Sequence, residues 1–325
     1  MLRNGFLMIV IPCCLCNNKT NMEGGILHQR KGEIPMKKLL SILMAMVLCM
    51  SLTAVSAEEA GYVETVVTID AGDHQIPATI CAPTAEGVYP AVVMLHGTGS
   101  SRDEAGNGYK MAAPVMAEKY GIVTIRFDFM GSGESTADYA NYNYTTAVAD
   151  AVVCAEYVGA MENVDADKIG VMGWSQGGTN ALSCAGRRPD VFKSVVTWAG
   201  APELGLLMTD ELYEEAKANG YFVMNFDWRE PLNVGLQWCE DVKNVDVLGE
   251  FAAFTGPVLA LHGTADVVVD PEWSNKIVAT STNELSRASF IEGMDHTFNV
   301  FSEPEFTSLY NAVDQTGAFF AETLK

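Results

Sequence analysis

A serine between two glycines is the chain's most informative chemical feature. Residues 173–177 read Gly-Trp-Ser-Gln-Gly, after an apolar run at 168–172 and before an expected helix at 178–187. A strand, a sharp turn and a helix form the setting in which a G-x-S-x-G motif lifts its serine hydroxyl clear of a sheet. The pattern is short, so the alternative is a glycine-rich turn in which Ser175 is idle. A catalytic serine also needs a base, an orienting acid and donors for an oxyanion.

The base is sought among the histidines, because a serine hydroxyl is a poor nucleophile until a base removes its proton. Four histidines lie beyond residue 57: His74, His96, His262 and His296. Only His296, in the loop after the last expected strand, comes last in the chain order serine, acid, histidine that accompanies this motif. We therefore predict that His296 is the base. The alternative is an ordinary histidine of a surface loop.

The orienting acid must lie between the serine and the base. Asp266 follows an apolar strand that ends near His262, at the edge of the sheet where the active site is expected. A carboxylate there can fix the imidazole tautomer and stabilise the imidazolium. Asp270 precedes a proline at an expected helix start, which suits a capping role. Asp295 adjoins the base and is too local to orient its ring easily, so Asp266 is the prediction.

Two backbone N–H groups are expected to hold the oxyanion. One belongs to Gln176, directly after the serine. The other belongs to Thr98, within the His-Gly-Thr-Gly stretch at 96–99 that follows the third expected strand. The alternative for this stretch is a plain turn.

Other kinds of chemistry leave no comparable trace in the sequence. It contains no H-E-x-x-H motif, no phosphate-binding G-x-x-x-x-G-K-[ST] motif and no cysteine cluster with metal-ligand spacing. The glycine-rich stretch at 128–135 lacks a lysine, so we interpret it as a tight loop beside the site. Acyl transfer by a serine requires no metal and no organic cofactor, and none is expected.

Alternating strand and helix patterns must position these residues. They predict an α/β fold with a doubly wound, mostly parallel sheet whose ligands bind at the carboxyl ends of the strands. Residues 63–69 and 75–82 are expected to form an opening antiparallel pair. The further expected strands are 91–95, 122–127, 169–172, 194–198, 258–261 and 288–291, and the expected helices are 110–120, 144–161, 178–187, 272–279 and 306–324.

Residues 201–255, called the cap segment below, interrupt this alternation. The segment is long for a strand-to-helix connection and rich in aromatic residues. We predict an inserted, partly helical cap with helices at 210–219 and 233–243. Its aromatic residues should form a small core of their own, and a few should face the site. Trp228 of the cap and Trp174 of the serine motif are the predicted substrate-binding residues.

The first 57 of the 325 residues are interpreted as a targeting segment that is not part of the fold. A basic stretch that starts at Met36 is followed by an apolar run and then by small residues that suit a cleavage site before Glu58. This is the layout of a secretory signal. Residues 36–57 are therefore predicted to be a signal peptide, and residues 1–35 an extension of the gene model. The expected location is secreted or at the cell surface. An uncleaved N-terminal anchor is the alternative.

The net charge of −21 argues against binding to nucleic acid or to anionic membranes. We expect a small-molecule ester as the partner and no stable membrane insertion after signal cleavage. The oligomeric state is not predicted. Cys81, Cys154, Cys184 and Cys239 lie beyond residue 57 at wide spacings, and Cys154 and Cys184 are expected to be buried free thiols.

With these residues identified, most of residues 62–325 resembles the α/β-hydrolase superfamily. Within it the chain is similar to bacterial feruloyl/cinnamoyl esterases and to serine hydrolases of the dienelactone-hydrolase and prolyl-oligopeptidase-like type. The resemblance implies the triad Ser175–Asp266–His296, the oxyanion donors Thr98 and Gln176, and a cap over the acyl pocket. The esterases often carry an aromatic residue where Thr98 stands, and usually a histidine where Trp174 stands. The stretches that carry the resemblance are 96–99, 128–135, 173–178, 262–266 and 293–296.

These observations predict a secreted serine carboxylesterase that works through an acyl-serine intermediate, with hydroxycinnamoyl esters as a candidate substrate class. A serine peptidase or amidase acting on short peptides would use the same triad and is the first alternative. A non-catalytic binding protein on a hydrolase fold is the second.

Overall fold

The computed structural model describes residues 61–325. The predicted extension at 1–35 and the predicted signal peptide at 36–57 lie outside the described residues. Within residues 61–325, no helix combines the length and the apolar character that crossing a membrane requires.

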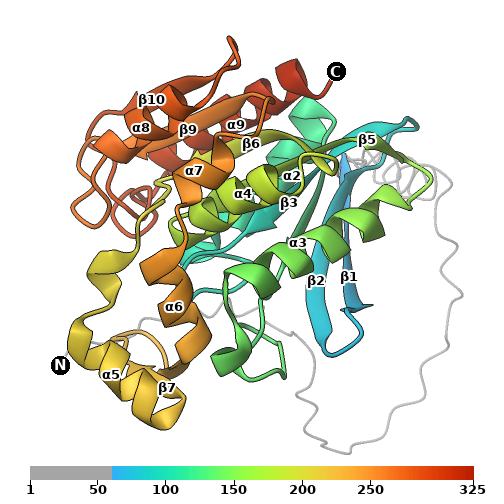
Figure 1. The fold of residues 1–325 in the computed structure, drawn as a ribbon. Coiled ribbons are helices and arrows are strands. Elements are labelled where there is room, and N and C mark those ends of the chain that lie inside the picture. Colours follow the sequence, from blue (N-terminus) through green and yellow to red (C-terminus); the bar gives the residue numbers. More distant parts are fainter. Residues whose placement is uncertain (1–60) are drawn as a thin grey trace, which may run out of the picture. The chain divides into compact units, whose positions relative to one another are not determined.

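One sheet of eight strands organises the described residues, as the sequence predicts (Figure 1). The first two strands in spatial order pair antiparallel, and so do the second and third, whereas all later neighbours are parallel. The spatial order is β1 (Tyr62–Asp70), β2 (Gln75–Pro83), β4 (Val123–Phe127), β3 (Tyr89–Leu95), β5 (Val164–Trp174), β6 (Phe192–Trp198), β9 (Val258–Gly263) and β10 (Arg287–Ile291).

Helices cover both faces of this sheet, which explains why its central strands are apolar on both sides. Successive side chains of a strand point to opposite faces, so Val93 joins one core and Val92 the other. The first core includes residues of α3 (Tyr144–Gly159), α4 (Gln176–Arg187) and α8 (Glu272–Thr280). The second includes residues of α2 (Gly108–Tyr120) and α9 (Thr307–Thr323).

The start of α3 shows how local sequence fixes an element. The side chain of Asn143 accepts the N–H groups of Thr145 and Thr146, and the Thr146 hydroxyl accepts the N–H of Asn143 in return. This reciprocal cap satisfies backbone donors that a helix N-terminus otherwise leaves open. Short 3₁₀ turns, η1 (Ala105–Asn107) and η2 (Tyr139–Asn141), shape two loops at the same end of the sheet as Ser175.

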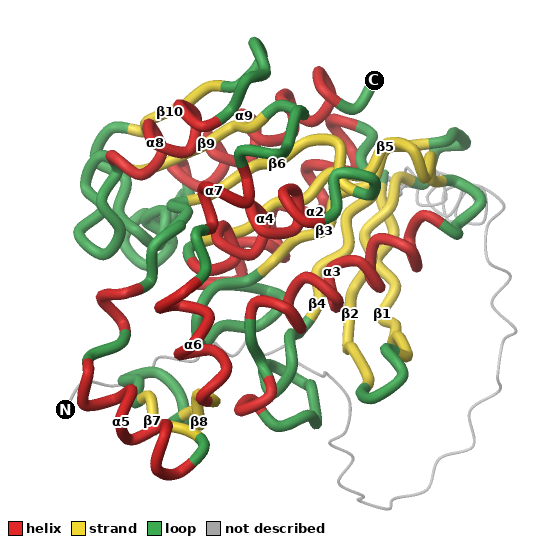
Figure 2. Tube along the Cα trace, viewed as in Figure 1, coloured by secondary structure: helices red, strands yellow, loops and turns green. Residues whose placement is uncertain are grey.

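The cap segment lies in the connection between β6 and β9 and has its own hairpin and helices (Figure 2). Phe222 and Trp238 are buried against each other, with ring centroids 6.3 Å apart, as the expected small core requires. The elements of the segment are η3 (Gly205–Leu207), α5 (Asp210–Asn219), β7 (Tyr221–Met224), β8 (Leu232–Gly235), α6 (Leu236–Asn244) and α7 (Val247–Phe251).

The prediction of a helix over 233–243 was wrong at its start. Asn233 and Val234 belong to strand β8 and pair with Val223 and Phe222. The helix begins only at Leu236. The hairpin escaped prediction because its strands are short and a connection of seven residues, 225–231, separates them without a two-residue turn signal. The prediction of α5, by contrast, is confirmed with its bounds.

Candidate active site

Ser175 occupies a strained turn between β5 and α4. Its φ of 56° and ψ of −121° lie outside the regions that ordinary residues adopt. Its backbone N–H donates to the carbonyl of Trp198 at 2.8 Å, which ties the turn to the neighbouring strand. A Cβ on Gly173 would overlap the carbonyl oxygen of Gly177, and a Cβ on Gly177 would overlap that of Leu95. The two glycines of the motif are therefore required by close backbone contact.

Three side chains from separate loops meet at this turn. His296 Nε2 lies 3.1 Å from Ser175 Oγ, and His296 Nδ1 lies 2.7 Å from Asp266 Oδ2. A carboxylate only accepts hydrogen bonds, so Nδ1 carries the proton and Nε2 is free to accept from the serine hydroxyl. The structure thus brings together the three residues that the sequence singled out, in the geometry of a nucleophile, a base and an orienting acid.

Asp266 is held by more partners than the sequence indicates. Its Oδ2 also lies 3.0 Å from Nε2 of His262, and its Oδ1 accepts the N–H groups of Val268 and Val269. Burial by itself would raise the pKa of Asp266, but the hydrogen bonds from His262 and His296 outweigh it and hold the pKa well below its usual range. The carboxylate is therefore ionised throughout the pH range in which an imidazole takes up a proton.

His262 is a site residue that the sequence analysis missed. It is fully buried, and its Nδ1 lies 2.9 Å from the Ser274 hydroxyl. Its Nε2 faces the acceptor oxygens of both Asp266 and Val269, so this nitrogen carries the proton. His262 thus positions the carboxylate through the same oxygen that His296 binds. The spacing of His262 and Asp266, four residues apart across a strand end, was the only signal in the sequence.

The two rival carboxylates have other tasks. Asp270 Oδ1 accepts the N–H of Glu272, the first residue of α8, but Pro271 occupies the N-cap position itself, so the expected N-cap role was wrong by one residue. Asp295 accepts from the N–H groups of Thr297 and Asn299 and so closes the turn that carries His296. Neither carboxylate is hydrogen-bonded to the imidazole.

Thr98 and Gln176, the predicted oxyanion donors, lie next to each other beside Ser175. The Thr98 hydroxyl donates to the side-chain oxygen of Gln176 at 2.5 Å, although they are 78 residues apart in the chain. Within residues 61–325, neither backbone N–H donates to a protein acceptor. Both donors therefore remain free to bind a developing negative charge.

His96 fixes the loop that carries Thr98. The buried ring accepts the N–H of Phe129 at Nε2, at 3.2 Å, so its proton lies on Nδ1, 2.9 Å from the carbonyl oxygen of Gly97. Burial lowers the pKa of His96, which keeps the ring neutral. This histidine supports the loop and is bonded to no member of the triad.

The prediction that Trp174 binds substrate was wrong. Its side chain is only 1% exposed and packs against Trp198 and Phe298 in the core beneath α2 and α9. Its indole N–H donates to the carbonyl of His296 at 2.9 Å, so it holds the loop of the base instead. Side chains alternate along a strand, and the last residue of β5 points into this core. Trp228, by contrast, is 72% exposed on the cap segment, and its predicted role remains a prediction.

Glu104 is a second residue that the sequence analysis missed. It accepts the N–H of Gly97 at 3.2 Å, and a Cβ on Gly97 would lie 3.2 Å from Glu104 Oε1 and 3.3 Å from Ser175 Cβ. Its φ of 62° is rare for a residue with a side chain. Burial raises the pKa of this carboxyl to about 7. Glu104 thus braces the backbone directly behind the nucleophile.

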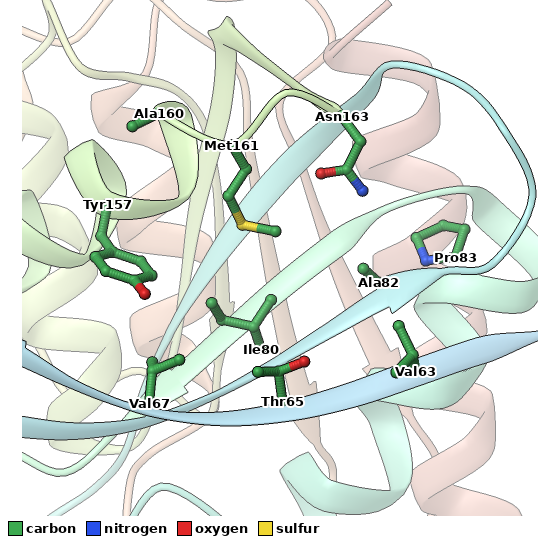
Figure 3. Close-up of a pocket in the computed structure, with 10 residues that line it drawn as sticks. All are labelled: Val63, Thr65, Val67, Ile80, Ala82, Pro83, Tyr157, Ala160, Met161 and Asn163. Carbon is green, nitrogen blue, oxygen red and sulfur yellow. The ribbon is translucent and has the colours of Figure 1, made fainter.

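The groove in Figure 3 is separate from this site. It has a volume of about 470 Å³ and is lined by β1, β2 and the end of α3, with Val67, Ile80 and Met161 among its residues. None of its lining residues belongs to the triad, to the cap segment or to the loop at 96–99, which is called the oxyanion loop below. Among residues 61–325 there is also no group of three histidine, cysteine or acidic residues placed to hold a metal ion.

Residues 108–325, more than half of the chain, match the prolyl oligopeptidase family. The chain belongs to the prolyl oligopeptidase family. Its fold is the α/β-hydrolase fold, and the predicted fold class and family resemblance are confirmed.

Among curated relatives, this family member is 29% identical over 199 residues to 2,6-dihydropseudooxynicotine hydrolase of Paenarthrobacter nicotinovorans. The match covers 59% of this chain and 48% of that one, so the chain spans about half the length of that relative.

Solved structures share the fold at low identity. Est1E from Butyrivibrio proteoclasticus, solved with ferulic acid bound, superposes with a TM-score of 0.64 at 18% identity, over 79% of this chain and 99% of that one. Dienelactone hydrolase from Anabaena variabilis superposes with a TM-score of 0.57 at 18% identity, over 82% and 100% of the two chains.

Proposed function

We propose that this member of the prolyl oligopeptidase family is a serine carboxylesterase that works through an acyl-serine intermediate. The observation that carries the proposal is the hydrogen-bond chain from Ser175 through His296 to Asp266. A nucleophile, a base and an orienting acid in hydrogen-bond contact are what acyl transfer to a serine requires.

In the first half-reaction, His296 Nε2 takes the hydroxyl proton while Ser175 Oγ attacks the ester carbonyl. The N–H groups of Thr98 and Gln176 hold the oxyanion. The ionised Asp266 stabilises the imidazolium that forms. His296 then gives its proton to the leaving alcohol, and the acyl-serine remains.

In the second half-reaction, His296 takes a proton from water, and the resulting hydroxide attacks the acyl-serine. The same two N–H groups hold the second oxyanion. His296 then protonates Ser175 Oγ as the carboxylic acid leaves, which restores the starting state. Every proton transfer uses one nitrogen of one histidine.

Hydroxycinnamoyl esters are the substrate class that we place first. The Est1E structure with bound ferulic acid supports this choice, since the two folds superpose over most of both chains. The cap segment adds Phe226 and Trp228, whose ring centroids lie 5.1 Å apart. The Phe226 ring lies against Gly99 of the oxyanion loop. An aromatic acyl group would find matching surface there.

A serine peptidase or amidase is the second candidate, favoured by the family match itself. A non-catalytic binding protein is the third, and the complete hydrogen-bond chain speaks against it. For location we propose export from the cell, supported by the layout of residues 36–57. Fractionation of the native host, with N-terminal sequencing of the recovered protein, tests the export; a cytosolic protein that retains residues 36–57 would refute it.

The function is tested with purified protein on p-nitrophenyl esters, methyl ferulate and aminoacyl anilides. We expect ester turnover, and a loss of at least about 10³-fold in kcat for Ser175→Ala, because removal of a triad nucleophile leaves only binding and the oxyanion hole. Ser183→Ala, a buried serine of α4 away from the triad, is the matched control. Anilide turnover that exceeds ester turnover would favour the peptidase. Undiminished turnover in Ser175→Ala would refute the mechanism.

A further inference from the structure

Arg229 of the cap segment contacts the oxyanion loop directly. Its Nη1 donates to the carbonyl of Gly99 at 2.9 Å. Its guanidinium also lies 5.9 Å from the ring centre of Phe226, and that ring packs closely against Gly99. Gly99 is two residues from Gly97, a span of at most about 7 Å. The guanidinium is therefore held on the loop that carries Thr98, at the residue directly after this predicted oxyanion donor.

Arg229 is the exception among the arginines of residues 61–325. The other five are all ion-paired: Arg102, Arg126, Arg187, Arg188 and Arg287. Arg229 has no carboxylate within ion-pair distance in this part of the chain, although its neighbours in sequence include Asp227 and Glu230. The chain has 41 acidic and 20 basic residues, so a partner for a cation is easily found. A half-buried arginine without an acidic partner is therefore an exception among the described residues.

The guanidinium also keeps donors in reserve. A guanidinium has five N–H groups. Within the described residues, Nη1 uses one for Gly99 and Nε uses its own for the carbonyl of Glu230 at 3.2 Å, whereas Nη2 donates to no protein acceptor. Two adjacent donors on a planar cation match the two oxygens of a carboxylate.

The charge of Arg229 reaches the residues around the nucleophile. Burial is the main cause that lowers the pKa of His96, and the positive charge of Arg229 lowers it further, against the opposing effect of Asp128. His96 immediately precedes Gly97, which packs behind Ser175. An anion bound to Arg229 would therefore lie within electrostatic range of the reacting carbonyl without touching the triad.

We propose that Arg229 is an anion subsite, and that the enzyme favours an acyl group that carries a carboxylate a few bonds from the scissile carbonyl over an uncharged aliphatic acyl group of equal length. This inference rests on the proposed esterase function and adds a charged acyl class to its substrates, beside the uncharged hydroxycinnamoyl class. The acyl carboxylate accepts from the free N–H groups of Arg229 while the ester carbonyl lies in the oxyanion hole. The unpaired cation then gains its partner only when a substrate of this class is bound.

The test compares charged and neutral esters of equal length. The charged set is the p-nitrophenyl monoesters of succinic, glutaric and adipic acid. The neutral set is p-nitrophenyl butyrate, valerate and hexanoate. For the best-fitting pair, we expect Arg229→Gln to lower the charged-to-neutral ratio of kcat/KM by about 10-fold or more, as loss of a charge-assisted pair predicts. Arg229→Lys should keep part of the preference. Arg287→Gln, an arginine on β10 paired with Glu322, should leave the ratio unchanged.

Binding gives a second measurement that needs no turnover. In the Ser175→Ala background, titration calorimetry with glutarate should show weaker binding when Arg229→Gln is added. An unchanged ratio in Arg229→Gln for all three pairs, or equal glutarate binding with and without Arg229, would overturn the anion subsite. Esters turned over in a Ser175-dependent way with no role for Arg229 would leave the proposed function standing. Glutarate binding through Arg229 without any ester turnover would leave the subsite standing and refute the esterase.

Discussion

Asp266 shows how much a single residue carries in this site. Its two oxygens accept four hydrogen bonds, from His262, His296, Val268 and Val269. Every partner is a donor. An isosteric amide therefore fails in either orientation, because its NH₂ group would face two N–H groups.

Asp266→Asn should accordingly lower kcat for a p-nitrophenyl ester by roughly 10³–10⁴-fold, since the tautomer and the imidazolium both lose their support. Steady-state kinetics on purified protein measures this loss. Asp270→Asn, four residues away and engaged at the start of α8, should change kcat by less than about threefold. Comparable losses in the two variants would show that Asp266 is not the orienting acid.

At the scale of elements, the turn between β5 and α4 depends on how closely three backbones approach. Gly177 opens α4 against the carbonyl of Leu95 at the end of β3, so the helix can lie across the strand end only without a side chain there. The same approach places Gln176 beside Thr98, whose hydroxyl donates to the side-chain oxygen of Gln176. The geometry of the oxyanion hole and the packing of α4 on the sheet are therefore one requirement.

Gly177→Ala should separate α4 from β3 and destabilise the protein by about 3 kcal/mol or more, because neither backbone can yield easily. Urea unfolding followed by circular dichroism measures the change. Gly205→Ala in η3 is the control, since a Cβ there meets nothing within 4 Å, and we expect less than about 1 kcal/mol. Equal stability of the two variants would contradict the close approach.

At the scale of the whole molecule, a buried carboxyl makes stability depend on pH. Asp150 of α3 is 2% exposed, its Oδ1 lies 3.2 Å from His74 Nε2 in the β1–β2 turn, and its Oδ2 has no hydrogen-bond partner among the described residues. Burial raises its pKa to about 7 from 3.8, against the lowering effect of His74. Between these values the folded protein keeps a proton that the unfolded chain has lost.

The stability that the protonated Asp150 contributes is therefore fully present below pH 3.8 and is lost as the pH rises through about 7. Glu104, whose pKa is also raised to about 7, acts in the same direction. We expect the free energy of unfolding from urea titrations to fall between pH 5 and pH 8, and to fall less in Asp150→Asn. Asp210→Asn, an exposed residue of α5, should retain the wild-type slope. An unchanged slope in Asp150→Asn would show that Asp150 does not cause the effect.

The order of strands and helices follows from local physics. Short apolar runs and helical spacing are properties of short stretches, so α5, the two last helices and every strand of the large sheet except β5 could be predicted to within about two residues at each end. The strand β5 begins at Val164, five residues before the predicted start at 169. The β7–β8 hairpin could not, because its short strands are stabilised by pairing across a long connection. Cap aromatics such as Trp238 were recognisable by composition, but their partners were not.

The sequence by itself determined which residues are the candidates for the proposed chemistry. The motif around Ser175, the chain order of Asp266 and His296, and the loop at Thr98 identify these residues before any fold is known, because the reaction restricts both their types and their order. The tertiary structure decided how each residue is held. It placed His262 on the acid, Glu104 behind the nucleophile and Arg229 against the oxyanion loop, and it buried Trp174 in the core. Arg229 and Gly99 are 130 residues apart in the chain. The other contacts depend on how a loop folds back on itself or on which face of a strand a side chain lies, so only packing could reveal them.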